Sequence, residues 1–166
     1  MKNEPQIREY AEKILKRTIE ELDDVRVHHA FKNQDPRFLD LSSEMFRQEF
    51  RGARLALAAR AWERACLENG LGGENILKML LRVVMNSFGS QENVDEAEVF
   101  SAYYQAPRSE EDPSVAACQL FFDRVGRHDL ADADKGQISP AFQILIALSE
   151  SFRAAFENKF FDFFNT

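Results

Sequence analysis

Phenylalanines gather at the C-terminal end of this 166-residue chain, and they limit what it can fold into. Seven of the fifteen lie between residues 142 and 164, and residues 160–164 read FFDFF. Aromatic side chains bring the largest apolar area of any residue type. The segment must therefore either fill a core or dock on another surface.

A helix beginning near Pro140 would sort these rings by face. At 100° per residue, one stripe collects Leu145, Phe152, Phe156, Phe160 and Phe163, widened by Phe142, Ile146, Leu148 and Phe164. Phe161 and Ile144 fall well outside this stripe, so we expect both side chains to be exposed in a monomer. The phase therefore assigns most rings to the protein's own core. It leaves Phe161, Ile144 and the fraying end at Phe164 unexplained.

Four proline-containing pairs mark helix starts. They are Glu4-Pro5, Asp35-Pro36, Asp112-Pro113 and Ser139-Pro140. In each pair a residue able to cap the first turn precedes a proline, whose missing N–H costs nothing at that position. Asn69-Gly70, Gly72-Gly73 and Gly89 are suited to helix ends. Because no segment alternates apolar and polar residues as a strand would, we predict an all-α fold.

The predicted helices cover residues 5–31, 43–68, 74–88, 92–105, 113–125 and the segment from Pro140 onward. The helix over 43–68 is rich in small residues, with six alanines and Gly52, which lets a neighbouring helix approach closely. The helix over 74–88 is apolar on nearly every side, as is typical of a buried central helix. No repeat or long linker divides the chain. We therefore predict one domain, residues 1–166, built as a bundle of five to six helices.

Composition and charge narrow the class of protein. The chain is 45% hydrophobic and 30% charged, and its net charge of −7 argues against sequence-independent binding to nucleic acid. The N-terminus lacks the apolar core of a signal peptide. The most apolar run, residues 76–85, is too short to span a bilayer and is interrupted by Lys78 and Arg82. We expect a cytoplasmic protein with neither a nucleic-acid nor a membrane partner.

Candidate metal and cofactor sites fail on geometry. The loop over 132–138 carries some residues of a calcium-binding EF-hand loop, but its glycine comes one position early and Gln143 stands where a bidentate Glu is needed. His28 and His29 diverge by about 100° on a helix, so they cannot share a metal ion. We expect both to be partly exposed near a helix end. Cys66 and Cys118 are interpreted as reduced core residues, and no cofactor is predicted.

No arrangement of residues indicates catalysis. Ser42, Ser43, Ser149 and Ser151 are explained by capping or by the polar face of a helix. His128 and Asp129 are adjacent in sequence, which does not make a triad, and residues 70–73 lack the lysine of a phosphate-binding loop. We favour a protein that is not an enzyme. An enzyme using these two residues or a glutamate in a cleft remains an alternative.

Three arginines form a stripe on the second long helix. Arg47, Arg51 and Arg54 are spaced by four and three residues and so share one face. A dock for an acidic partner or a phosphate is one interpretation. We favour a solvated face with Glu44 and Glu49 as ion-pair neighbours, because exposed ion pairs of this kind are common.

The aromatic tail carries the functional hypothesis. We predict a non-enzymatic interaction or regulatory protein that self-associates through its C-terminal helix, as a homodimer or on a protein partner. The interaction candidates are Phe161, Ile144, Phe164, Arg47, Arg51 and Arg54. The alternative is a bundle that encloses an apolar small molecule, such as an acyl chain or a hydrophobic cofactor. Met79, Met85, Phe121, Phe122 and the tail stripe would line its cavity.

Overall fold

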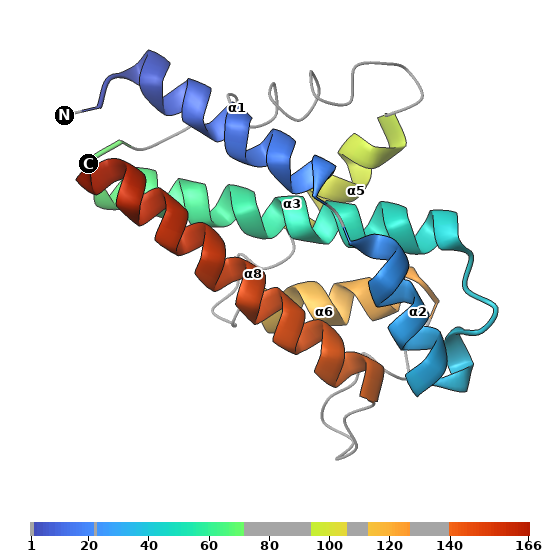
Figure 1. Ribbon diagram of the computed structural model, residues 1–166. Coiled ribbons are helices and arrows are strands. Elements are labelled where there is room, and N and C mark those ends of the chain that lie inside the picture. The colour runs from blue at the N-terminus through green and yellow to red at the C-terminus, as the bar shows by residue number, and fades with distance from the viewer. Residues whose placement is uncertain (1, 22, 72–93, 106–112, 127–139) are drawn as a thin grey trace.

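The computed structural model describes residues 2–21, 23–71, 94–105, 113–126 and 140–166 (Figure 1). These residues form α1 (Glu4–Glu20), α2 (Asp24–Gln34), the 3-10 helix η1 (Pro36–Phe38), α3 (Ser43–Glu68), α5 (Val94–Gln105), α6 (Pro113–Arg124) and α8 (Pro140–Asn165). No strand occurs among them. The predicted all-α bundle of five to six helices is confirmed. The helix predicted over 74–88, which includes Met79 and Met85, and the loop over 132–138 lie outside the described residues.

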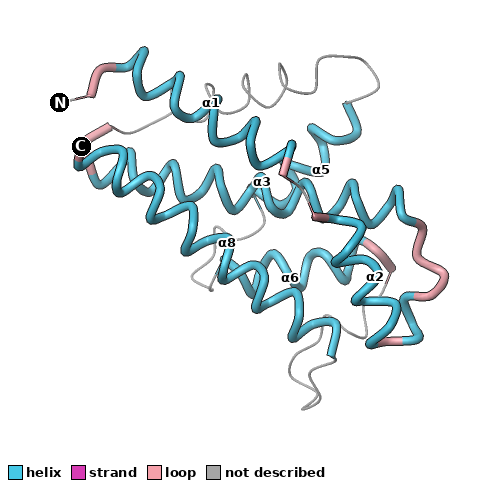
Figure 2. The backbone as a smooth tube through the Cα atoms, in the orientation of Figure 1, coloured by secondary structure: helices cyan, strands magenta, loops and turns pink. Residues whose placement is uncertain are grey.

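α3 occupies the middle of the bundle and packs against α1, α2, α5, α6 and α8. Figure 2 shows the other helices arranged around it, with α1 and α8 crossing it obliquely. Its bounds match the prediction, and the hydroxyl of Ser42 accepts the Met45 N–H at 3.2 Å as a cap. Gly52 faces α5, where an added Cβ would lie 2.5 Å from Cγ1 of Val99. The small residues of α3 therefore allow α5 its close approach.

The first predicted helix is wrong in one respect, because residues 5–31 do not form a single helix. α1 ends at Glu20 and α2 begins at Asp24. Consecutive Asp23 and Asp24 are poor helix-interior residues, and negative charge is unfavourable at a helix C-terminus but favourable at an N-terminus. In a single helix over 5–31, Val25 would continue the apolar spacing of Ile7, Ala11 and Ile14. The break redirects the chain, and Val25 is 78% exposed.

Helix starts follow the predicted capping logic with a shift at the N-terminus. Asn3 caps α1, with its side chain accepting from the Gln6 N–H at 3.0 Å while the Gln6 side chain accepts from the Asn3 N–H. The helix therefore begins at Glu4, one residue before the predicted start. α6 begins at Pro113 and α8 at Pro140, as predicted.

Aromatic rings fill the core in two groups. At the end where α2, α3 and α6 meet, Phe31 packs edge-on against Phe38, Phe46 and Phe121 with ring centroids 5.3–6.2 Å apart. At the other end, where α1, α3 and α8 meet, Trp62 packs against Phe160 at 4.9 Å. Both groups are buried almost completely. The phenylalanine content of the chain thus serves first to fill its own interior.

Candidate interaction surface

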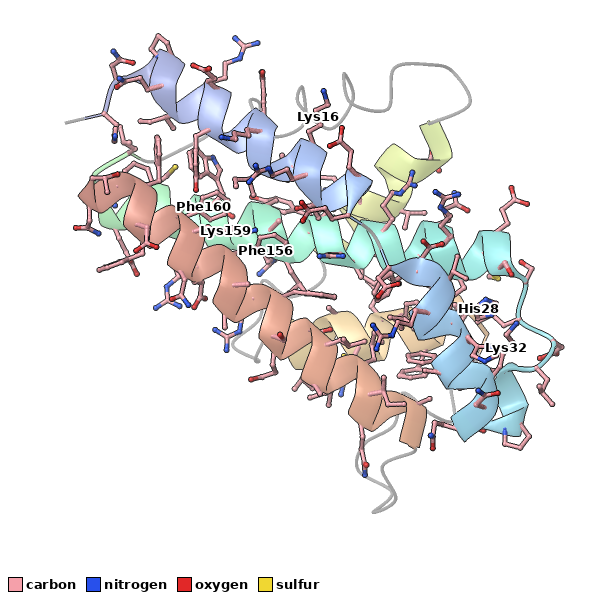
Figure 3. The ribbon with its side chains drawn as sticks, viewed as in Figure 1. Lys16, His28, Lys32, Phe156, Lys159 and Phe160 are labelled. Atoms are coloured by element: carbon pink, nitrogen blue, oxygen red, sulfur yellow. The ribbon has the colours of Figure 1, made fainter. Side chains whose placement is uncertain are left out.

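The inner face of α8 carries the predicted aromatic stripe into the core. Phe142, Leu145, Phe156 and Phe160 are buried, and Phe152 and Phe163 are half-buried. Figure 3 labels Phe156 and Phe160 on the side of α8 turned toward the rest of the bundle. The predicted helical phase is confirmed for this face.

Two of the three tail residues that the helical phase left unexplained are packed in the structure. Phe164 stacks on Trp62 with ring centroids 5.8 Å apart, so the C-terminal turn is held in place. Neighbouring Phe163 stacks on Tyr10 at 4.1 Å, and the Tyr10 hydroxyl donates to the Lys159 carbonyl at 3.1 Å. Ile144 is half-buried and packs against the core, at the end of α8 that α6 lies alongside (Figure 1). The expectation of exposure was wrong for Ile144, and the C-terminal end at Phe164 packs with the stripe that the helical phase assigned to it.

Phe161, the third of these tail residues, stays exposed, at 62% of its surface. It belongs to an outward stripe of exposed residues that fall within about 80° of one another on the helix. The stripe consists of Gln143, Ala147, Ser151, Ala154, Asn158, Phe161 and Asn165, and we call it the outer face of α8. None of its members is charged, although 30% of the chain is. An uncharged stripe along a solvent-facing helix is unusual in such a chain.

A shallow groove lies beside Phe161, between α8 and the C-terminal half of α3. A hollow of about 400 Å³ is lined by Ala61, Arg64, Ala65, Glu68, Asn69, Glu157, Asn158, Phe161 and Asn165. A second of about 290 Å³ shares three of these residues and adds Arg153 and Leu67, which is 56% exposed. The groove thus joins the two exposed apolar side chains Phe161 and Leu67.

Ion pairs neutralise the charges of this groove. Glu157 accepts from Arg64 at 3.3 Å and from Arg153 at 3.1 Å, and Arg153 also lies 3.7 Å from Glu150. Arg64 pairs in addition with Glu68 at 3.1 Å. These pairs are partly to largely solvent-exposed, so each contributes little to stability. Their effect is to leave little unpaired charge beside the outer face of α8.

The arginine stripe of α3 does not form the solvated face that we expected. Arg47 lies 3.5 Å from Asp24 and remains exposed. Arg51 is half-buried. Arg54 packs over the ring of Phe152 at 4.1 Å, and burial lowers its pKa from the ordinary value. Arg47 and Arg54 therefore tie α3 to α2 and α8, and the three do not present one open binding surface.

A buried polar cluster joins α3, α5 and α6, and sequence reasoning missed it. Glu49 is 5% exposed and accepts from the Tyr103 hydroxyl at 2.8 Å and from Nε of Arg124 at 2.7 Å. Burial and the Glu49 charge raise the pKa of Tyr103 well above its ordinary value. Glu49 was expected as an exposed neighbour of the arginine stripe, which is wrong. Glu49 shares a helix face with the apolar residues Phe46 and Ala53, and this spacing was the signal in the sequence that Glu49 would be buried.

His28 is buried at 4% exposure, contrary to the prediction of a partly exposed surface histidine. The break before α2 turns it inward, where it stacks on Phe46 with centroids 4.6 Å apart. Its Nε2 lies 3.1 Å from the Leu41 carbonyl, so this nitrogen carries a proton and donates. Burial and neighbouring Lys32 lower the pKa of His28. Adjacent His29 is exposed, as expected.

The two cysteines are buried free thiols, which agrees with their interpretation as core residues. Burial raises the pKa of Cys66 to about 12, so its thiol is a poor nucleophile at neutral pH. Among the described residues, no three His, Cys, Asp or Glu side chains gather as a metal site would require. Within the same part of the chain, no helix has the length and hydropathy needed to cross a membrane.

Comparison with protein-family models, with curated proteins and with solved structures finds no match to this chain. The outer face of α8 with its adjoining groove is therefore the candidate site on the strength of its own geometry.

Proposed function

We propose that this protein is a helical interaction module that self-associates through the outer face of α8. The observation that carries the proposal is Phe161, an aromatic side chain 62% exposed near the C-terminal end of an uncharged helix face. Burying a phenylalanine side chain is worth about 1.5–3 kcal/mol. A two-fold dimer would bury two copies of it with a single contact.

The charge distribution favours a second copy of this chain as the partner. A net charge of −7 makes copies repel one another at long range. The outer face of α8 carries no charge, and the carboxylates of Glu150 and Glu157 beside it already pair with Arg153. The carboxylates on this border of the face are therefore already paired when two copies meet, and Asp162 lies at the opposite border. A strongly basic partner would find few free carboxylates on this surface.

The alternative of an enclosed apolar ligand gains no support from the described residues. Phe121 and Phe122 are fully buried and pack against one another with centroids 5.7 Å apart. The two hollows described above are open at the surface and are lined by several charged side chains. We therefore place self-association first.

Multi-angle light scattering and sedimentation equilibrium test the proposal. We expect the wild-type chain to be a dimer at about 50 μM, a concentration at which even micromolar affinity populates the complex. Phe161→Ser should be monomeric and equally stable. Val25→Ser is the matched control, because Val25 is 78% exposed on α2, far along the chain from α8. A monomeric wild type, or equal loss of association in both variants, would contradict the proposal.

A further inference from the structure

We propose that Asn69 is a site of spontaneous deamidation, and that the cap at the C-terminal end of α3 sets the rate of this reaction. The sequence contains a single Asn-Gly pair, Asn69-Gly70, and the structure places Asn69 at the C-cap of α3. Glycine has no side chain to hinder the approach of its backbone nitrogen to the preceding asparagine. The pair therefore has the most reactive sequence for this chemistry, in a fold that restrains both reacting groups.

The reaction needs water as its one co-reactant. The backbone nitrogen of Gly70 attacks Cγ of Asn69, and its proton leaves with the side-chain nitrogen as ammonia. The new C–N bond closes a succinimide ring. Water then adds to either carbonyl of the ring and breaks one of its C–N bonds, which gives aspartate or isoaspartate. No oxidant or reductant takes part.

The backbone of the cap is a Schellman motif that holds the nucleophile. The Gly70 N–H donates to the Leu67 carbonyl at 3.1 Å, and the Leu71 N–H donates to the Cys66 carbonyl at 2.8 Å. Gly70 has a φ of +76°, the left-handed conformation that this motif requires. The nitrogen that would attack is therefore engaged as a donor in the folded chain.

The side chain of Asn69 is held away from that nitrogen. Its Nδ2 donates to the Ala65 carbonyl at 2.8 Å, one turn back along α3, and so satisfies an acceptor at the helix end. Gly70 lies on the other side of Asn69 along the chain. The two reacting groups are thus each fixed by a hydrogen bond that must break before they can meet.

Opening of this cap should therefore control the rate in the folded protein. Leu71 anchors the cap, because its half-buried side chain packs against the core. Helix ends open locally at a lower free energy than the whole fold. Three hydrogen bonds of ordinary net strength reduce the open population by about ten- to hundredfold. We expect the folded chain to react more slowly than the unfolded chain by this factor.

The product changes the end of α3. Aspartate cannot donate to the Ala65 carbonyl, and it adds negative charge at the negative pole of the helix. Asn69 lines the hollow of about 400 Å³ together with Glu68 and Glu157, which already share Arg64 at 3.1 and 3.3 Å. Isoaspartate lengthens the backbone and disrupts the Schellman bonds. Deamidation should therefore loosen the last turn of α3 and make the groove more acidic.

Peptide mapping by mass spectrometry tests the proposal on the full-length protein, incubated at mildly alkaline pH either folded or in guanidinium chloride. Trypsin releases residues 65–78, in which tandem spectra distinguish Asn69 from Asn75. We expect Asn69 to convert in both samples, about ten- to hundredfold more slowly in the folded one. Leu71→Ala removes the anchor of the cap but keeps the Asn-Gly pair, and should bring the folded rate closer to the unfolded rate.

Asn165 is the matched control within the same chain. Its Nδ2 donates to the Phe161 carbonyl at 2.8 Å, one turn back along α8, as that of Asn69 does along α3. The next residue is Thr166, whose branched side chain hinders attack by its backbone nitrogen. We expect Asn165 to stay unchanged during the time in which Asn69 converts.

Each outcome decides the proposal. Slow conversion of Asn69 in the folded protein, faster in Leu71→Ala, supports it. Equal rates in the folded and unfolded chains would show that the cap gives no protection. Complete conversion of the unfolded chain, with none in folded wild type or Leu71→Ala, would show that the cap does not open. Conversion of Asn165 at the rate of Asn69 would overturn the assignment to the Asn-Gly pair.

Discussion

Phe160 and Phe161 are neighbours of the same residue type with opposite environments. Phe160 is 1% exposed and packs edge-on against Trp62, whereas Phe161 is 62% exposed and borders the surface groove between α8 and α3. Successive residues of a helix lie 100° apart, so a one-residue step moves a side chain from core to surface. Identical side chains therefore stabilise the core in one case and, in the other, stay at the surface where the proposed self-association would use them.

The same contrast holds for two glutamates. Glu49 is buried and binds Tyr103 and Arg124, so it joins three helices. Glu157 pairs with Arg64 and Arg153 at the surface, where water can replace either partner. Burial, and not the number of hydrogen bonds, decides how much each carboxylate contributes.

The largest effect is expected from Phe160→Ala. Removing a ring packed against Trp62 leaves a cavity in the core and should lower the free energy of unfolding by about 3–5 kcal/mol. Phe161→Ala, its matched control, should change the free energy by less than about 0.5 kcal/mol in dilute protein. Urea unfolding followed by circular dichroism measures both. Similar losses in the two variants would show that their environments do not differ as described.

Glu49→Ala should have the next largest effect. The substitution leaves Nε of Arg124 and the Tyr103 hydroxyl without their buried acceptor, and we expect a loss of about 2–4 kcal/mol. Glu157→Ala removes exposed ion pairs and should cost about 0–1 kcal/mol. Chemical denaturation of both variants at one pH makes the comparison. If Glu157→Ala lowered the free energy of unfolding as much as Glu49→Ala, burial would not explain the difference between the two carboxylates.

We expect a smaller effect on stability when the pH is changed, and it should come from buried His28 and not from exposed His29. Because the pKa of His28 is lowered in the folded chain, the unfolded chain binds more protons below its ordinary pKa of about 6.5. Stability should therefore be constant above about pH 7.5 and fall as the pH is lowered through 6.5. His28→Gln should flatten this dependence, while His29→Gln should retain it. Denaturation midpoints between about pH 7.5 and 5.5 provide the readout, and an unchanged slope in His28→Gln would refute this role.

Much of the architecture could be predicted from local patterns. Ser42 and the proline of α8 mark helix starts correctly, and the phase of the tail places Phe156 and Phe160 in the core. These features depend on residues within a few turns of one another. The burial of His28 could not be predicted in this way, because Phe46 and Leu41, which it contacts, come from a different segment of the chain.

The amino-acid sequence alone determined that this chain is helical, where α3 and α8 begin, and that Phe161 points away from the aromatic core. Helical periodicity and capping act over a few residues, so they can be read without knowing which helices meet. Only the tertiary structure decided that Glu49 binds Tyr103 and Arg124, and that Phe164 is covered by Trp62. Such contacts join residues far apart in sequence, and their partners depend on how the helices pack.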